Sequence, residues 1–276
     1  WAGKHWSSAV RTEHLATRAS AGLFDESSFA KILVSGEDAP KFLNFVCAND
    51  VVKGVDRTIY TQALNSGGGI ESDYTVTQIA SDKCMIVTGT AFGVHDLGWL
   101  EKLRRENNFD LSISDITNSL ACFGLWGPHA RDILQSITDY DLSHKNFPFM
   151  HSREISIAGF EVRATRITYV GELGWEMYLP IENGEAFWLQ LIEAGKKFDM
   201  KVCGYRAIES LRLEKGYRAW GVEISTETNP WEAGLEFAIS LGKDAFVGKE
   251  ALLNLRENLS RKLVAITFDD IRQVPL

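Results

Sequence analysis

Asp73 is the residue of this sequence whose position most suggests acid–base chemistry, because it interrupts a strand-like run rich in threonine. Alternation along a strand would place Glu71, Asp73, Thr75 and Thr77 on one face. Aspartate is disfavoured inside strands, so a carboxylate here asks for a functional reason. The alternative is a solvated sheet face without a catalytic role, and the pattern alone leaves both interpretations open.

A second candidate lies in residues 169–176, where two glycines interrupt a pair of strands. Tyr169 opens this segment and Glu176 closes it, and Glu176 would share a strand face with Tyr178. A carboxylate beside an aromatic wall suits a flat, amidine-like heterocycle, because it would accept hydrogen bonds from the N–H groups of that ring. The alternative is a turn that carries an exposed glutamate.

Arg212 is a third candidate, because it lies between two leucines and one helical turn from Glu209. An arginine in such a setting most often forms a structural ion pair. If it faces a cleft, it would instead clamp a carboxylate. The glycines at 67–69 carry a similar choice between a hairpin turn and a close approach of backbone to ligand.

Composition excludes several classes of protein. The chain has 276 residues, 45% of them hydrophobic, 24% charged, with a net charge of −8. Such a composition is typical of a globular protein. Because Lys and Arg never cluster beyond a pair, we expect no nucleic-acid partner. No apolar run reaches the roughly 18 residues of a membrane helix. Phosphate-loop, nucleophile-elbow, dinucleotide and zinc-protease motifs are missing from the sequence.

The four cysteines are widely separated singletons, Cys47, Cys84, Cys122 and Cys203. This spacing disfavours a zinc site or a disulfide frame. We therefore predict four buried thiols and a reducing compartment, either the cytoplasm or, in a eukaryote, the mitochondrial matrix.

Hydrophobic periodicity predicts an α+β fold built from two similar halves, each an antiparallel sheet backed by helices. Residues 35–39 and 126–130 share the order strand, glycine, two residues, alanine, helix. The expected strands are 29–35, 60–64, 70–79, 84–88, 121–126, 153–157, 161–168, 175–179, 237–241 and 262–268. The expected helices are 8–21, 37–46, 92–105, 127–134, 182–194, 203–217 and 248–258.

These elements predict one main region over residues 1–260, with halves at about 18–115 and 118–240. Residues 261–276 are expected to begin a truncated C-terminal β-barrel domain, since the chain starts at Trp1 and ends just after a strand-like run. On this interpretation the sequence is a piece of a longer polypeptide.

Six short runs, taken in order, resemble the folate-binding family of the glycine cleavage system T protein (aminomethyltransferase). They are residues 60–65, 68–73, 169–176, 211–214, 232–235 and 246–252. Each run is weak alone, and the set in the family's order is specific. Residues 125–128 and 213–221 further resemble the C-terminal folate domain of dimethylglycine and sarcosine dehydrogenases and oxidases.

The resemblance implies a tetrahydrofolate-dependent enzyme that captures a one-carbon unit from a small N-methylated amine as methylenetetrahydrofolate. FAD would belong only to an N-terminal flavin domain in the full-length chain. No membrane partner is implied. A free-standing aminomethyltransferase or demethylase of the same fold is an alternative. An iron–sulfur assembly factor is less favoured, since residues 243–250 lack the cysteine of that branch's signature.

Carried over by position, the resemblance assigns Asp73 as the catalytic aspartate, which handles a proton and stabilises developing positive charge. It implies that Glu176 binds the amino edge of the pterin and that Arg212 lies near the pterin or a folate carboxylate. Gly89 departs from the asparagine expected in the plain T protein. The folate-contacting positions implied are Tyr60, Thr75, Gly89, Tyr169, Glu176, Arg212 and Trp220.

Overall fold

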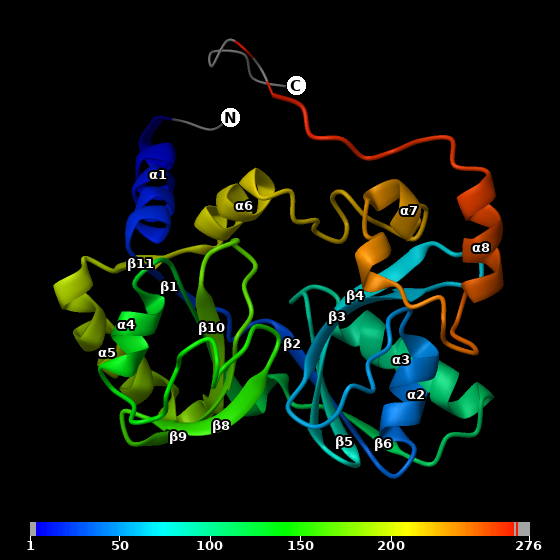
Figure 1. Ribbon diagram of the computed structural model, residues 1–276, viewed down its shortest axis with the longest axis horizontal. Helices are drawn as coiled ribbons and strands as arrows, with labels where there is room; N and C mark the ends of the chain where they lie inside the picture. Colours follow the sequence, from blue (N-terminus) through cyan, green and yellow to red (C-terminus); the bar gives the residue numbers. More distant parts are fainter. Residues whose placement is uncertain (1–3, 268, 270–276) are drawn as a thin grey trace.

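The computed structural model describes residues 4–267 and 269, which form two β-sheets with helices on their outer faces (Figure 1). The first sheet contains β2 (Ala30–Ser35), β3 (Thr58–Leu64), β4 (Ile70–Ala80), β5 (Lys83–Thr88) and β6 (Ser112–Asp115). The second contains β1 (Gly22–Asp25), β7 (Leu120–Trp126), β8 (Ser152–Ile157), β9 (Phe160–Thr165), β10 (Gly174–Pro180) and β11 (Lys201–Cys203).

The helices are α1 (Lys4–Ala19), α2 (Ala39–Val46), α3 (Gly93–Glu106), α4 (Ala130–Gln135), α5 (Gly184–Gly195), α6 (Tyr205–Glu214), α7 (Pro230–Ala233) and α8 (Lys249–Glu257). Short 3₁₀ turns are η1 (Thr117–Ser119), η2 (Ile181–Asn183), η3 (Lys196–Phe198) and η4 (Glu236–Ala238). The predicted α+β class is confirmed.

The two sheets repeat one strand order. The first runs β3-β4-β5-β2-β6 and the second β8-β9-β10-β7-β1-β11, so that β1 is the additional strand, inserted before the last position. β1 runs parallel to β11, and the other strand pairs recorded in the described residues are antiparallel. In each half the chain passes through strand, helix, three strands, helix and strand.

The repeated glycine turn has the same local structure in both halves. Gly36 and Gly127 have φ of 138° and 142°, a conformation that side chains disfavour. The amide of Ala39 donates to the Gly36 carbonyl at 2.9 Å, and the amide of Ala130 donates to the Gly127 carbonyl at 3.1 Å. A Cβ on Gly127 would lie 2.3 Å from the Ser20 carbonyl oxygen. Both turns therefore start a helix directly after a strand.

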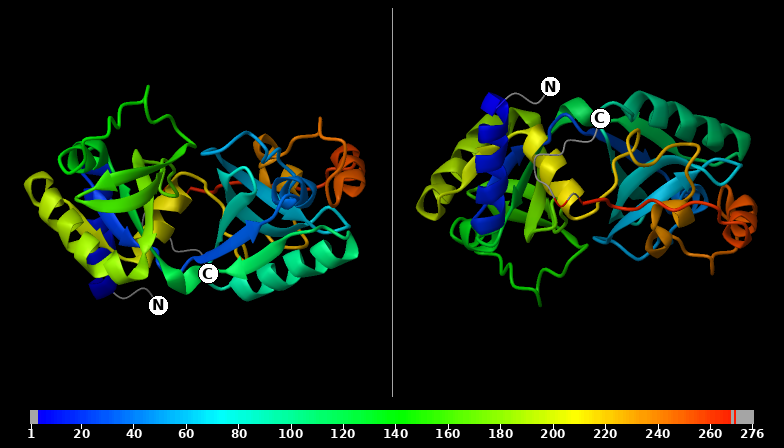
Figure 2. Two further views of the ribbon diagram at one scale, coloured as in Figure 1. Left: turned by 90° about the horizontal axis from the view of Figure 1, so that it is seen from below. Right: turned by 90° about the horizontal axis from the view of Figure 1, so that it is seen from above.

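Each half has its own hydrophobic core between its sheet and its helices. Phe42 of α2 and Leu100 of α3 pack on the first sheet, whereas Phe187 of α5 packs on the second. The inner faces meet through a smaller cluster that includes Met85 and Tyr178. Figure 2 shows the sheets on either side of the molecular centre, with these helices outside.

Two expected strands are wrong. Residues 237–241 begin with the last residues of η4. Ile239 and Leu241 then pack against a core cluster that includes Ala233 and Phe246. Residues 262–267 form no strand, and Phe268 lies outside the described residues. Of the expected C-terminal β domain, residues 270–276 also lie outside them.

The strands that periodicity missed are short. β1 and β6 have four residues each and β11 has three, so none is long enough to show alternation. Cys203, expected in a helix, ends β11, and α6 begins two residues later.

All four cysteines are buried and free, as predicted. Among the residues that the structure describes, no cluster of three or more His, Cys, Asp or Glu could hold a metal ion. Within the same residues, every helix is too short or too polar to cross a bilayer.

Candidate functional site

Asp73 lies in the middle of β4, with its side chain beside that of Tyr60 on β3. The register pairs Gln62 with Asp73 and Tyr60 with Thr75, so these two pairs are neighbours on one face of the hairpin. Tyr60 Oη donates to Asp73 Oδ2 at 3.0 Å. Burial raises the pKa of the Asp73 carboxyl to about 6, and the Tyr60 hydrogen bond opposes that rise. Asp73 can therefore both release and hold a proton near neutral pH.

A second aspartate lies behind Asp73 on the opposite face of β4. Asp96 at the start of α3 accepts hydrogen bonds from Ser72 Oγ at 3.0 Å and Thr88 Oγ1 at 2.8 Å. His95 Nδ1 lies 3.1 Å from Asp96 Oδ1, and His95 Nε2 lies 3.0 Å from Glu71. The charge of Asp96 raises the pKa of Asp73 further. No motif or spacing in the sequence singles out Asp96.

Gly89 and Trp220 meet through Phe92, which precedes α3. The Phe92 ring stands edge-on to Trp220 at 4.6 Å, and a Cβ on Gly89 would lie 3.0 Å from the Phe92 ring. Trp220 Nε1 donates to the Ile70 carbonyl at 2.9 Å, which fixes the indole against the start of β4. Two predicted positions thus form one aromatic corner beside the Asp73 strand.

Phe237, which sequence reasoning did not select, stacks on Tyr60 with ring centroids 6.2 Å apart. Its side chain is 73% exposed, which is unusual for phenylalanine. It extends the aromatic surface that begins at the Asp73–Tyr60 pair.

Tyr169 comes from the other half, in the loop between β9 and β10. It stacks on Tyr217 at 6.0 Å, and its Oη donates to the Arg218 carbonyl at 2.7 Å. Burial and the Asp73 carboxylate both raise the pKa of Tyr169. The charge of Asp73 in one half is thus felt by Tyr169 in the other.

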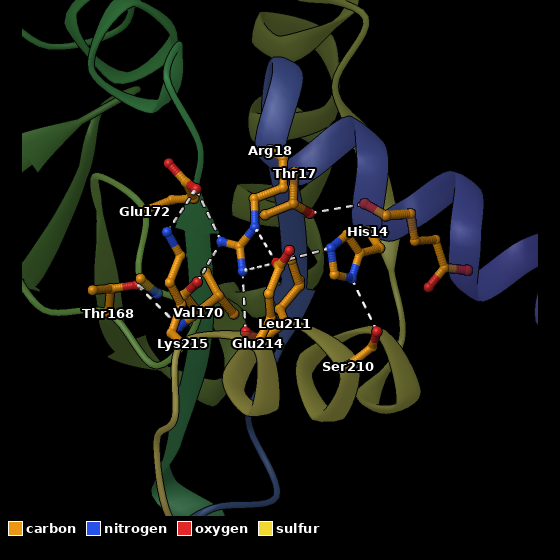
Figure 3. A network of polar contacts seen from close by, with 12 residues as sticks. His14, Thr17, Arg18, Thr168, Val170, Glu172, Ser210, Leu211, Glu214 and Lys215 are labelled. Carbon is orange, nitrogen blue, oxygen red and sulfur yellow. Dashed lines mark hydrogen bonds and ion pairs between the residues drawn. The ribbon is translucent and has the colours of Figure 1, made fainter. Parts of the chain in front are cut away.

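Arg18 of α1 holds the Tyr169 loop in place (Figure 3). Its guanidinium donates to the Val170 carbonyl at 2.5 Å and to Glu172 at 2.9 Å. The same group reaches α6 through the Leu211 carbonyl at 3.0 Å and Glu214 at 2.9 Å. One arginine thus ties α1, the Tyr169 loop and α6 together.

Arg212 is almost completely buried, and it forms structural ion pairs, the more common of the two roles considered from the sequence. Its guanidinium pairs with Glu209 and, at 2.7 Å, with Glu223. It also donates to the Tyr217 carbonyl at 3.0 Å. Arg212 Nε is buried without a partner. Most of its donors are therefore committed to holding the segment that carries Tyr217.

Glu176 lies in β10, opposite Gly124 on β7 and Thr165 on β9. Its side chain is buried with 7% of its surface exposed, and Tyr178 Oη donates to Glu176 Oε2. Burial raises the pKa of Glu176 to about 7. An acceptor of this kind suits a neutral ligand that presents N–H groups in one plane. Glu176 and Asp73 occupy different sheets.

The family of the chain follows from comparison with known proteins. Residues 2–243 match the family described as GCVT N-terminal domain. Dimethylglycine dehydrogenase of Rattus norvegicus is 36% identical over 271 residues, which cover 97% of this chain and 32% of that protein. An aminomethyltransferase of Caldanaerobacter subterraneus subsp. tengcongensis is 36% identical over 96% of this chain and 70% of that protein.

A solved structure shows the same fold. The crystal structure of glycine cleavage system aminomethyltransferase T from Bartonella henselae matches with a TM-score of 0.80 and 30% identity, covering 90% of this chain and 66% of that one. The chain spans about a third of the dimethylglycine dehydrogenase that it resembles. With two sheets, the shared glycine turns and a family match over most of its length, this chain belongs to the GCVT aminomethyltransferase family.

Proposed function

We propose that this chain carries out tetrahydrofolate-dependent one-carbon transfer, with Asp73 as the group that handles the proton. The observation that carries the proposal is the Asp73 carboxyl, which accepts a hydrogen bond from Tyr60 and has a pKa raised to about 6. Family membership supports folate as the ligand. The proposed donor is an N-methylated amine such as dimethylglycine or sarcosine, with 5,10-methylenetetrahydrofolate as product.

The residues of the chain fit a folate. Glu176 keeps a small exposed surface and offers a carboxylate to the amino edge of a pterin. Tyr60 and Tyr169 would flank the ring, with Thr75, Gly89 and Trp220 as further contacts. We propose that Arg212 acts mainly by holding the Tyr217 segment, with its unpartnered Nε–H as its one donor toward ligand.

Bound tetrahydrofolate would supply the nucleophilic nitrogens that accept the one-carbon unit. Asp73 Oδ1, the oxygen that does not accept from Tyr60, is the atom proposed to take the proton that such a nitrogen releases. In its ionised form, Asp73 also stabilises positive charge that develops nearby. General acid–base assistance of this kind contributes about 10²–10⁴-fold to a rate.

The finer parts of the proposal concern the donor and the whole protein. Similarity to dimethylglycine dehydrogenase supports an N-methyl amine as donor and a flavin-containing partner domain. Similarity to an aminomethyltransferase over 70% of that protein supports the free-standing alternative. The repeated strand order supports halves at 18–115 and 118–240 as the domain division. We further propose a cytoplasmic or mitochondrial-matrix location.

The test is a coupled assay for 5,10-methylenetetrahydrofolate. The chain is incubated with tetrahydrofolate and sarcosine or dimethylglycine, while an added flavin-dependent amine oxidase generates the one-carbon unit. We expect the chain to raise the ratio of methylenetetrahydrofolate to free formaldehyde, and D73N to abolish that gain. A parallel arm supplies an aminomethylated carrier protein as donor.

Product formation no faster than the uncatalysed condensation in both arms would overturn the proposal. Folate binding without transfer in either arm would favour the assembly-factor alternative. A gain only with the aminomethylated carrier would favour the free-standing aminomethyltransferase.

A further inference from the structure

Arg18 lies in the last turn of α1, and it bonds both to the loop that carries Tyr169 and to α6. Its guanidinium donates from Nη1 to the Val170 carbonyl at 2.5 Å and from Nη2 to the Leu211 carbonyl at 3.0 Å. A guanidinium carries five N–H donors in a rigid plane, so one side chain can hold two segments at a fixed separation. Arg18 therefore sets the spacing between the Tyr169 loop and α6.

The bond from Arg18 acts directly beside Tyr169, because the carbonyl that it reaches belongs to the next residue of the chain. The Val170 side chain is fully buried in a cluster with residues of α6. Within the loop, Thr168 Oγ1 accepts from the amides of Val170 and Gly171, both at 3.1 Å. The backbone next to the Tyr169 ring is thus held from inside the loop by Thr168 and from outside it by Arg18.

Two glutamates converge on Arg18 from the segments that it joins. Glu172 of the loop lies 2.9 Å from Nη1, and Glu214 at the end of α6 lies 2.7 Å from Nη2 (Figure 3). The side chains of Arg18 and Glu172 are 18% and 20% exposed, so solvent screens their attraction only in part. Beyond Arg18, Glu172 lies 4.0 Å from Lys215 and Glu214 lies 3.1 Å from His14. Without the Arg18 charge the two carboxylates would repel each other, and the loop should move away from α6.

The contacts of the Tyr169 ring depend on the same spacing. Its stacking partner Tyr217 and the Arg218 carbonyl that accepts from its hydroxyl both lie just beyond the end of α6. The charge of Arg18 opposes the rise that burial causes in the pKa of Tyr217, so it also reaches that ring. A change in the distance between the loop and α6 would therefore shift the Tyr169 ring relative to its partners.

We propose that Arg18 is a positioning residue for the folate site: it fixes the Tyr169 ring beside the pterin by holding the Tyr169 loop against α6. The inference rests on the proposed function, in which Tyr169 flanks the ring of the folate. Arg18 has no contact with ligand and no part in proton transfer, because its donors are engaged by the loop and by α6. It should therefore affect how tightly folate binds and leave the transfer step unchanged.

The experiment is a double-mutant cycle between Arg18 and Tyr169, measured by calorimetric titration with tetrahydrofolate at pH 7.5 under reducing, anaerobic conditions. R18M keeps an apolar stem and removes the guanidinium donors. It should weaken binding about tenfold when Tyr169 is present and less than about twofold in the Y169A background, because residues that act through one another are not additive. The rate of one-carbon transfer by R18M at saturating tetrahydrofolate should stay within about twofold of wild type.

R131M is the matched control. Arg131 of α4 is also a half-buried arginine, and it donates from Nε to the Leu142 carbonyl at 3.0 Å, in a loop with no proposed ligand contact. Its loss should lower stability without changing the affinity for folate. R18K keeps a positive charge between the two glutamates but loses the planar fork, so its affinity should fall between those of wild type and R18M. R18K also replaces R18M in the cycle if R18M does not fold.

A ligand-free measurement separates this inference from the proposed function. Amide hydrogen exchange of residues 168–173, followed by mass spectrometry, should be faster in R18M than in wild type and unchanged in R131M. Unchanged exchange in R18M, equal binding by R18M and wild type, or the same loss of affinity with and without Tyr169 would overturn the role of Arg18. Faster exchange in R18M together with a wild type that binds no tetrahydrofolate would overturn the proposed function, while the attachment of the loop by Arg18 would stand.

Discussion

Asp73 in the first sheet and Glu176 in the second are two carboxylates in similar local settings. They differ in the acidic residue that lies near each. Each lies on a strand that faces the molecular centre, each accepts from a tyrosine hydroxyl, and burial raises the pKa of each. The acid near Asp73 is Asp96, which has three hydrogen-bonding neighbours. The acid near Glu176 is Glu26, a buried residue whose oxygens have none.

This difference teaches how one protein can prepare two carboxyl groups for different work. Burial raises the pKa of Asp96, and the hydrogen-bond donors around it oppose that rise by stabilising the ionised form. Glu26 has no such donors, so it is expected to hold its proton. The Asp73 side is thus suited to proton exchange during a reaction, and the Glu176 side to recognition of N–H donors.

Asp73→Asn should have the largest effect. Removing the acid–base group should slow one-carbon transfer by about 10²–10⁴-fold. Because the amide has the same shape, tetrahydrofolate binding should stay within a few-fold of wild type. Transfer kinetics and calorimetric titration measure the two quantities. If binding and rate fall together by the same factor, Asp73 is a structural residue.

Substitutions of the neighbouring acids, Asp96 and Glu26, should change the free energy of unfolding differently. Asp96→Asn should lower the free energy of unfolding by about 2 kcal/mol, because it weakens hydrogen bonds to a buried charged acceptor. Glu26→Gln should instead be neutral or stabilising at pH 8. Urea unfolding of both variants at pH 8 measures the contrast. Equal destabilisation by the two substitutions would contradict the distinction between a satisfied and an unsatisfied acid.

Tyr60→Phe should have a smaller effect, confined to pH dependence. The Tyr60 hydroxyl stabilises ionised Asp73, so its removal should raise the pKa of Asp73 from about 6. A hydrogen bond to a charged group contributes about 1.5 kcal/mol, which corresponds to roughly one pH unit. The acid limb of the transfer rate should therefore move toward pH 7. Tyr178→Phe is the matched control in the other sheet. Because the Tyr178 hydroxyl bonds to Glu176 and not to Asp73, the variant should leave that limb in place when tetrahydrofolate is saturating.

Much of the fold could be predicted from residue patterns. The two glycine turns carried a local signal, because a strand that ends in glycine with positive φ leads directly into a helix. The hairpin with Asp73 carried one as well, since its alternation is long. The apolar stretches at 237–241 and 262–267 misled, because short hydrophobic runs do not distinguish strands from segments that pack as turns or remain irregular.

Residues around the proposed site were harder to predict. Asp96, Phe237 and Glu26 come near the proposed site through the pairing of strands and turns that are distant in sequence, and none belongs to a local motif. The ion pairs of Arg212 with Glu209 and Glu223 likewise depend on the path of the chain after α6. Sequence reasoning left both roles of that arginine open, and only its three-dimensional surroundings favour the structural one.

Calorimetric titration of the chain with tetrahydrofolate, in parallel with Glu176→Ala, tests the central claim most directly. The measurement is made at pH 8 under reducing, anaerobic conditions. Saturable binding is expected, and the substitution should weaken it by roughly 10- to 100-fold, since a hydrogen-bonded charged acceptor contributes about 1.5–3 kcal/mol. Absence of binding by a demonstrably folded chain, or equal binding by wild type and variant, would contradict the account.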